Sequence, residues 1–308
     1  MNRVTVAILT YKRPDDLHEA LPQLVAAIEE HPGAEILVVD NDVVPSAETA
    51  VTSLQEPRIR YVHEPSPGIA SARNRAIDET HDRDVLIFID DDERPASGWL
   101  RNLLGVQQKS GAEAVAGPVL SEYGGELDPW IVAGGYFRHP RWSTGTEIGV
   151  AATNNLLLLR DFIVEHGLRF DEEFGLSGGS DSVFTRQLVR AGGRIVWCDE
   201  AVVIDVIPDS RATRNWVRRR AFRLGNTEAR ARIHVARPGG ERLKERIVCL
   251  GKGLARVAGG AAKVGLGGLT RSVQTEARGT RTALRGAGML LAGFGYRYFE
   301  YRRTPARQ

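Results

Sequence analysis

Short runs of apolar residues, separated by segments with helical spacing, constrain the fold of this chain more than any other feature. Four such runs lie in the first ninety residues, at 4–9, 36–39, 59–62 and 85–89. Between the first two, apolar residues recur at three- and four-residue steps, and Pro22 predicts a kink or a late helix start there. Strands that are apolar on both faces and alternate with helices are typical of a mostly parallel sheet covered on both sides. We therefore predict an α/β, Rossmann-like fold.

The composition is that of a folded protein. Apolar residues make up 42% of the 308 residues, so we expect a packed core. No apolar run reaches the roughly 18 residues of a membrane-spanning helix. The first residues lead directly into the apolar run and show no basic region or cleavage site, so we expect no secretory signal. Cys198 and Cys249 match no metal or redox spacing and indicate a reducing compartment. We expect a cytoplasmic location.

The charge is distributed very unevenly along the chain. Residues 1–207 carry 18 basic and 33 acidic residues, a net charge of −15, and residues 208–308 carry 23 basic and 6 acidic residues, a net charge of +17. Such polarity predicts two regions with different partners. Residues 121–150 are rich in glycine, proline and aromatic residues and are interpreted as loops, and we find no clear internal repeat.

The strongest single motif is a run of four acids, Asp90 to Glu93, directly after the apolar run at 85–89. Adjacent carboxylates repel one another, and a divalent cation removes that cost. Carboxylate and phosphate oxygens are the ligands that Mg²⁺ or Mn²⁺ prefers. The alternative is a solvated acidic turn or a helix cap, since Asp92 lies shortly before Pro95.

Three further elements have both a functional and a purely structural interpretation. Asp40 ends the second apolar run and can bind a base or ribose, or only form a turn. The segment 68–76 offers a glycine, small residues and Arg73 to an anion, or is a capped surface helix. Asp181 follows Gly178 and Gly179 and can act as a base, or only cap a helix.

In this order, the motifs resemble those of the family 2 glycosyltransferases, which are inverting enzymes with the GT-A fold. The resemblance covers about residues 3–225 and includes the segment 6–14, the Asp40 strand end, the segment 68–76, the acidic run and the loop before Asp181. Within the family it is nearest to bacterial enzymes of exopolysaccharide assembly, of the succinoglycan type. The segments 154–158 and 211–220 also resemble that group.

The resemblance implies a role for each matching residue. Thr10, Tyr11 and Arg13 would line the nucleotide pocket, Asp40 would hold the base, and Arg73 would assist it. Asp90 and Asp92 would form the DxD motif and bind Mn²⁺ or Mg²⁺, with Asp92 as the direct metal ligand. Asp91 would belong to the cofactor-binding residues. Asp181 would take the proton of the acceptor hydroxyl.

The same resemblance implies a nucleotide-sugar donor, with a UDP-sugar favoured, and a glycan or polyprenyl-linked acceptor in cell-envelope or exopolysaccharide synthesis. The chain departs from the family pattern at Ser180, where an acid is usual, and at 204–208, where many members place a histidine. These departures motivate an alternative: a catalytically silent relative that binds a nucleotide or glycan, or acts as a scaffold. A nucleotidyltransferase is a further alternative, but it would require a glycine-rich loop with a lysine after the first strand. Residues 10–14 do not form such a loop.

Two regions are expected: a GT-A domain at 1–225 and a basic helical region at 226–308. We expect the basic residues from 208 onward to bind an anionic membrane surface, peripheral to the inner face of the cell membrane, and we expect no nucleic-acid partner. The segment 289–299 would lie in the interface, and Arg285, Arg297, Arg302 and Arg303 would reach lipid head groups.

Overall fold

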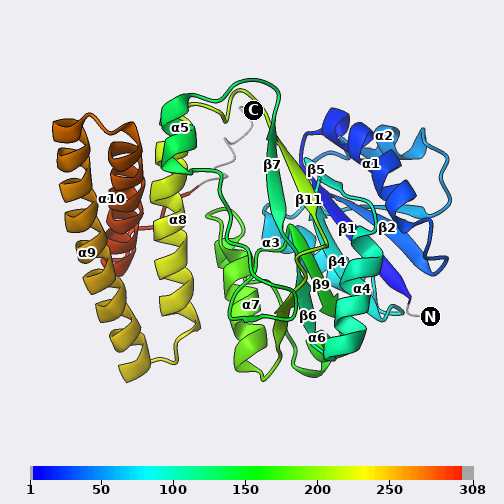
Figure 1. The fold of residues 1–308 in the computed structure, drawn as a ribbon. Helices are drawn as coiled ribbons and strands as arrows, with labels where there is room; N and C mark the ends of the chain where they lie inside the picture. Colours follow the sequence, from blue (N-terminus) through cyan, green and yellow to red (C-terminus); the bar gives the residue numbers. More distant parts are fainter. Residues whose placement is uncertain (1–2, 300–308) are drawn as a thin grey trace, which may run out of the picture. The chain divides into compact units, whose positions relative to one another are not determined.

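The computed structural model describes residues 3–299, and most of its first 206 residues are built around an eight-stranded, mostly parallel sheet (Figure 1). The strand order is β3-β2-β1-β4-β9-β6-β10-β8. The first four strands in this order are parallel, β9 runs antiparallel to both of its neighbours, and β8 is antiparallel to β10. The strands are β1 (Val4–Thr10), β2 (Ala34–Asp40), β3 (Ile59–His63), β4 (Val85–Asp90), β6 (Ala114–Ala116), β8 (Glu147–Ile148), β9 (Asn155–Leu159) and β10 (Ile195–Trp197).

Helices cover both faces of this sheet, as predicted. Because successive strand residues point to opposite faces, Val6 and Ile8 pack with α1 and α4, whereas Ala7 and Leu9 pack with α3, α6 and α7. Pro22 lies inside α1, which already begins at Pro14. The helices of this part are α1 (Pro14–Ile28), α2 (Glu48–Thr52), α3 (Ile69–Asp78), α4 (Trp99–Ser110), α6 (Arg160–Glu165), the 3₁₀ helix η1 (Glu172–Phe174) and α7 (Ser180–Arg190).

A second, three-stranded sheet has the order β5-β11-β7. Its strands are β5 (Glu93–Pro95), β7 (Val119–Tyr123) and β11 (Val203–Ile207). The strands β5 and β11 are antiparallel, and Glu93 lies opposite Asp205. This pairing brings Asp205, which lies about two-thirds of the way along the chain, next to the acidic run that follows β4.

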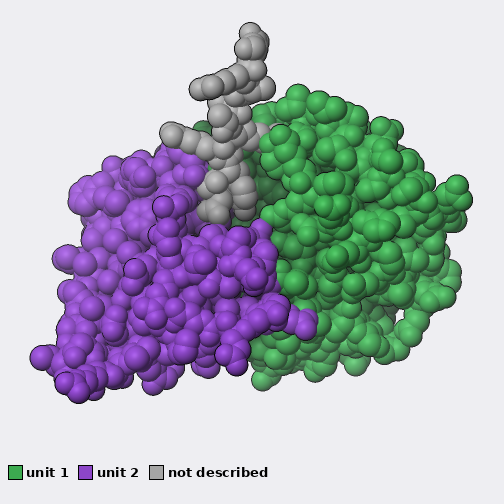
Figure 2. Space-filling view, turned by 90° about the horizontal axis from the view of Figure 1, so that it is seen from above, with its two compact units in different colours: residues 1–120, 139–176, 180–206 green, residues 121–138, 177–179, 207–308 purple. Residues whose placement is uncertain are grey.

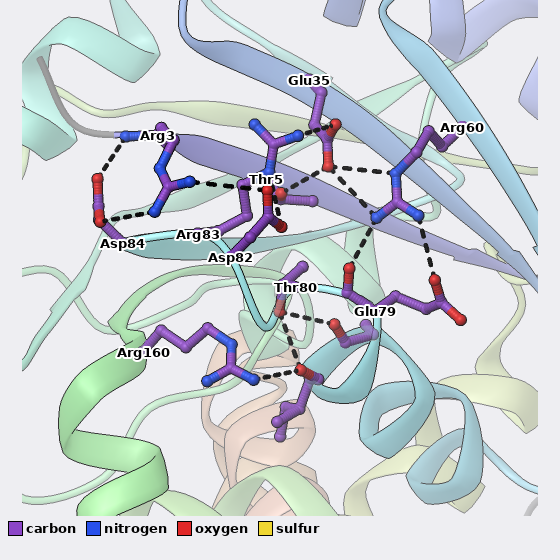
Figure 3. Close-up of polar contacts among 12 residues, drawn as sticks. Arg3, Thr5, Glu35, Arg60, Glu79, Thr80, Asp82, Arg83, Asp84 and Arg160 are labelled. Atoms are coloured by element: carbon purple, nitrogen blue, oxygen red, sulfur yellow. Dashed lines mark hydrogen bonds and ion pairs between the residues drawn. The ribbon is translucent and has the colours of Figure 1, made fainter.

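The amino ends of the parallel strands are held by a network of ion pairs (Figure 3). Glu35, at the start of β2, accepts hydrogen bonds from Thr5 of β1, Arg60 of β3 and Arg83. Arg60 also donates to the carbonyl oxygen of Glu79 over 2.8 Å. These contacts connect the amino ends of neighbouring strands. The candidate residues predicted from the sequence lie at the opposite side of the sheet, near the carboxyl ends of the strands.

The chain divides into two compact units (Figure 2). One comprises residues 1–120, 139–176 and 180–206, and the other comprises residues 121–138, 177–179 and 207–308. The expected boundary between residues 225 and 226 falls within α8. The division into a GT-A domain at 1–225 and a basic helical region at 226–308 therefore stays a prediction.

The second unit contains a helical bundle. Its helices are α5 (Pro129–Gly134), α8 (Arg214–Val235), α9 (Gly240–Thr270) and α10 (Val273–Gly293). The helix α10 packs against both α8 and α9. Asp128 caps α5 by accepting a hydrogen bond from the amide of Trp130, so the interpretation of residues 121–150 as loops alone was wrong. The aromatic residues of that segment stabilise the unit, because Trp130 stacks on Tyr136 and Phe137 on Trp216.

Candidate functional site

The candidate site lies at the carboxyl ends of β1, β2 and β4, where ligands bind in open α/β sheets. The strand register places Thr10 beside Asp40, and Leu9 beside Asp90. The three strand ends that the sequence singled out are therefore adjacent.

Asp91 holds β1 and the acidic run together. Its carboxylate is buried, and it accepts hydrogen bonds from the Thr10 hydroxyl over 2.9 Å and from Arg13 Nη1 over 2.9 Å. Arg13 Nη1 also contacts Asp92 Oδ2 at 3.1 Å. Burial raises the pKa of Asp91 to about 6, and the nearby Arg13 cation opposes that rise. Arg13 is thus the counter-ion of two of the four adjacent acids.

Asp90 lies at the centre of a group of carboxylates. Burial, with Asp92 close by, raises its pKa to about 7, and the Arg73 guanidinium opposes the rise. Glu93 is buried, and it accepts hydrogen bonds from the Asp90 amide over 3.0 Å and from Asn154 Nδ2 over 2.7 Å. Burial and the neighbouring Asp90 also raise the pKa of Glu93. These clustered carboxyl groups therefore favour their neutral form unless a cation binds beside them.

Arg73 connects the acidic run to α7. It lies on α3 and is only 8% exposed. Its Nη1 donates to the Ser180 hydroxyl over 2.8 Å, and its guanidinium lies 5.4 Å from the centre of the Phe170 ring. Since Ser180 begins α7 and Asp181 is the next residue, Arg73 links the Asp90 region to the first turn that carries Asp181. The Asp181 carboxylate accepts a hydrogen bond from the Ser182 amide over 2.6 Å.

Asp40 is fully buried, and its carboxylate is held by the loop that follows β2. The amides of Asp42 and Ala47 donate to it over 3.1 and 2.7 Å, and the Tyr61 hydroxyl donates over 3.0 Å. Asp40 therefore fixes this loop, and its contact with a nucleobase stays a prediction. Tyr11 directly follows β1, with 37% of its surface exposed and Lys12 Nζ 5.3 Å from the centre of its ring.

Gly68 allows α3 to start close to another backbone. Its φ is +118°, and a Cβ atom there would come within 3.3 Å of the Gly175 backbone. Its amide donates to the Asn41 side chain over 3.1 Å. Asn41 in turn donates to the carbonyl oxygens of Glu64 and Ser66, so the loops after β2 and β3 are fixed together.

The sequence interpretation assigned no role to Glu93, Asn154 or Asp205. Asp205 acts electrostatically on both Asp90 and Glu93, although it lies more than one hundred residues further along the chain. One signal was available: Asp205 is an acid within the otherwise apolar segment Val202–Ile207.

Among residues 3–299, no three His, Cys, Asp or Glu side chains are arranged to hold a metal ion by themselves. Asp90 and Asp92 nevertheless fit a site that is completed by phosphate oxygens, because Mg²⁺ is usually held by one or two carboxylates plus substrate phosphates. The clustering of carboxyl groups around Asp90, with Glu93 bonded to its amide and Asp205 paired opposite Glu93, supports this fit.

Comparisons with known proteins agree with this geometry. Residues 5–166 match the model of the family described as Glycosyl transferase family 2. The chain is 38% identical over 232 residues to the succinoglycan biosynthesis protein ExoM of Rhizobium meliloti (strain 1021), covering 74% of each chain.

Solved structures share the fold. The structure of S. aureus TarS 1-349 in complex with UDP-GlcNAc aligns with a TM-score of 0.53 at 16% identity, covering 91% of this chain and 90% of that one. GalNAc-T7 with UDP, GalNAc and Mn²⁺ aligns with a TM-score of 0.57 at 14% identity, covering 75% of this chain. The chain spans 48% of GalNAc-T7 and 42% of the longer S. aureus TarS structure. These likenesses confirm the predicted fold, and the matches in sequence show that the chain belongs to glycosyl transferase family 2.

Proposed function

We propose that this protein is an inverting, metal-dependent glycosyltransferase that moves a sugar from a nucleotide-sugar donor, a UDP-sugar, to an acceptor hydroxyl. The observation that carries the proposal is the position of Arg73. It acts on Asp90 at the end of β4 and bonds to Ser180 at the start of α7. Arg73 therefore acts electrostatically on one candidate metal ligand and donates a hydrogen bond to the residue that precedes the candidate base.

The donor would bind along the carboxyl ends of β1, β2 and β4. Tyr11 would stack on the base, and Thr10, Arg13 and Asp40 would shape the pocket. Asp90 and Asp92 would hold Mn²⁺ or Mg²⁺ together with the diphosphate oxygens, and that ion would stabilise charge on the departing diphosphate. Asp91 would act through its bonds to Thr10 and Arg13, which keep Asp92 in place.

Asp181 would serve as the general base. Its carboxylate would take the proton of the acceptor hydroxyl while the acceptor oxygen bonds to the anomeric carbon. The bond from that carbon to the nucleoside diphosphate breaks, and the diphosphate leaves with the electron pair. Attack from the face opposite the leaving group inverts the anomeric centre.

The acceptor class is proposed from the relative in Rhizobium meliloti, which is named for succinoglycan biosynthesis. We assign this chain a lipid-linked or polysaccharide precursor in exopolysaccharide synthesis. Such an acceptor places the enzyme at the inner face of the cell membrane, with the basic region 226–308 as its docking part. Within the described range 3–299, no helix is both long and apolar enough to cross a membrane.

A screen of nucleotide sugars for hydrolysis, with Mn²⁺ and with EDTA, tests this function. We expect one donor to be hydrolysed slowly, with Mn²⁺ present and not with EDTA. A protein that binds the donor tightly but hydrolyses none, and transfers to no glycan or polyprenyl diphosphate acceptor, would instead be a silent relative. Hydrolysis that EDTA leaves unchanged would refute the metal part of the proposal.

A further inference from the structure

One face of α9 is apolar from end to end and exposed. Its residues follow one another at three- and four-residue steps, the spacing of a single helix face, and each is exposed. Four of them are large: Leu243 and Ile247 are each 59% exposed, Leu254 is 63% exposed and Leu269 is 86% exposed. The whole set, named here the outer face, is Leu243, Ile247, Gly251, Leu254, Ala258, Ala261, Gly265 and Leu269. It extends over about 39 Å of helix.

The packing of α9 on α10 determines which side of the helix is exposed. Gly253, Gly260 and Gly267 are buried at seven-residue intervals. A Cβ atom at Gly260 would come within 2.5 Å of the Ala283 amide nitrogen, and one at Gly267 would come equally close to that of Glu276. The two backbones therefore meet along the glycine side, and the apolar side opposite has no partner among the described residues.

Basic residues flank the outer face. From residue 246 to residue 275 the chain has five basic residues and no acidic ones. At 3.6 residues per turn, the exposed Lys244 and Arg246 lie on either side of the apolar stripe. Long basic side chains next to an apolar stripe can bury their methylene stems and still reach anionic groups at a lipid surface.

We propose that the outer face of α9 docks into the interface of an anionic lipid membrane. The apolar stripe would enter the boundary between head groups and acyl chains, and Lys244 and Arg246 would contact lipid phosphates. This inference rests on the membrane location in the proposed function. It is independent of the metal and of the base.

Charge favours the lipid over a second copy of the chain. Two α9 helices packed along their outer faces would bring the flanking basic residues of both copies together, and like charges repel. An anionic surface neutralises the same residues, which lowers the free energy of docking for each Lys or Arg near it.

The outer face is a second apolar surface, in addition to the segment 289–299 that the sequence led us to expect at the interface. In the segment 289–299, Met289 is fully buried and Ala292 is 4% exposed, and both pack with Cys249 of α9. Leu291, Phe294, Tyr296 and Phe299 are exposed. Arg302 and Arg303 lie outside the described residues. Contact of the segment 289–299 with lipid therefore stays a prediction, and the proposal for α9 does not depend on it.

Vesicle sedimentation of the full chain tests the proposal. We expect the wild type to pellet with vesicles of phosphatidylcholine and phosphatidylglycerol, and the double variant Ile247→Ser/Leu254→Ser to partition about tenfold less. The matched control is Val132→Ser/Val164→Ser, which removes two valines that are 51% and 57% exposed and lie outside α9. It should pellet as the wild type does. Lys244→Gln/Arg246→Gln should lower binding to anionic vesicles about 30-fold.

Two further measurements separate the outcomes. Donor hydrolysis without lipid should be equal in all four proteins, so a failure of docking and a failure of catalysis are distinguished. Equal pelleting of the wild type and the Ile247→Ser/Leu254→Ser variant would overturn the proposal. It would also be overturned if light scattering without lipid showed a dimer that this variant converts to a monomer, because a second copy would then cover the outer face.

Discussion

Two neighbouring glycines of α9 should respond in opposite ways to the same substitution. Gly259 is exposed, and a Cβ atom there would have no neighbour within 4 Å. Gly260 is buried, and a Cβ atom there would lie 2.5 Å from the Ala283 amide nitrogen. Replacing either with alanine raises intrinsic helix stability by about 1 kcal/mol. At Gly260 the two helices must also part by about 0.9 Å to restore a 3.4 Å contact.

The contrast between the two variants isolates the cost of that separation, because their helix propensity terms cancel. Overpacking of this kind costs about 1–3 kcal/mol. The neighbouring backbone cannot relax freely, since a Cβ atom at Gly279 would itself be 2.8 Å from the Gly260 carbonyl oxygen. We expect Gly259→Ala to stabilise α9 and α10, and Gly260→Ala to be less stable than it by about 1–3 kcal/mol.

Hydrogen exchange, measured by mass spectrometry on peptides from α9 and α10, reports the free energy of local opening of these helices. Amides in these helices should exchange roughly 5- to 150-fold faster in Gly260→Ala than in Gly259→Ala, which corresponds to the same free energy range. Equal protection in the two variants would refute the close packing of α9 on α10. Greater protection in Gly260→Ala would refute it as well.

Two further predictions concern the candidate site, and a third concerns the core of the sheet. Calorimetry should show that Mn²⁺ strengthens nucleoside diphosphate binding to the wild type and not to Asp92→Ala; an effect of equal size in both would remove Asp92 from the metal site. Ser180→Ala should lower the free energy of unfolding by about 1–3 kcal/mol, because Arg73 loses a hydrogen-bond acceptor. The control Ser182→Ala should lower it by less than about 0.5 kcal/mol. Thermal denaturation of both variants checks the difference. Asn155→Ala should cost about 2 kcal/mol or more, since the Trp99 indole N–H and two backbone carbonyl oxygens lose their partner. An unchanged melting temperature would contradict that reasoning.

The sheet could be predicted from the sequence because each strand is recognised from its own short run of residues. Each run such as Val85–Ile89 is apolar on both faces, and this alone identifies a strand buried between helix layers. The positions of Asp40 and Asp90 at strand ends followed from the same pattern. Helix α5 was missed because its six residues are too few to show a periodicity, and its aromatic residues serve the core of the second unit.

The rest of the site depends on contacts that no local pattern contains. Arg73 and Ser180 are 107 residues apart, and the structure alone shows that the unusual serine accepts a hydrogen bond from the arginine. Glu93 meets Asp205 only because β5 pairs with β11. The seven-residue spacing of glycines at 253, 260 and 267, and at 279, 286 and 293, is visible in the sequence. It was overlooked among the many other glycines, although helix packing gives it a clear meaning.

Asp181→Asn tests the proposed transfer most directly. With the donor identified by the hydrolysis screen and a competent acceptor, turnover should fall by about 10² or more, since a positioned base contributes on that scale. Donor affinity with Mn²⁺ should stay near that of the wild type, because Asp181 is not proposed to contact the nucleotide or the metal. If Asp181→Asn keeps most of its turnover, Asp181 is not the base and the proposed transfer mechanism is contradicted.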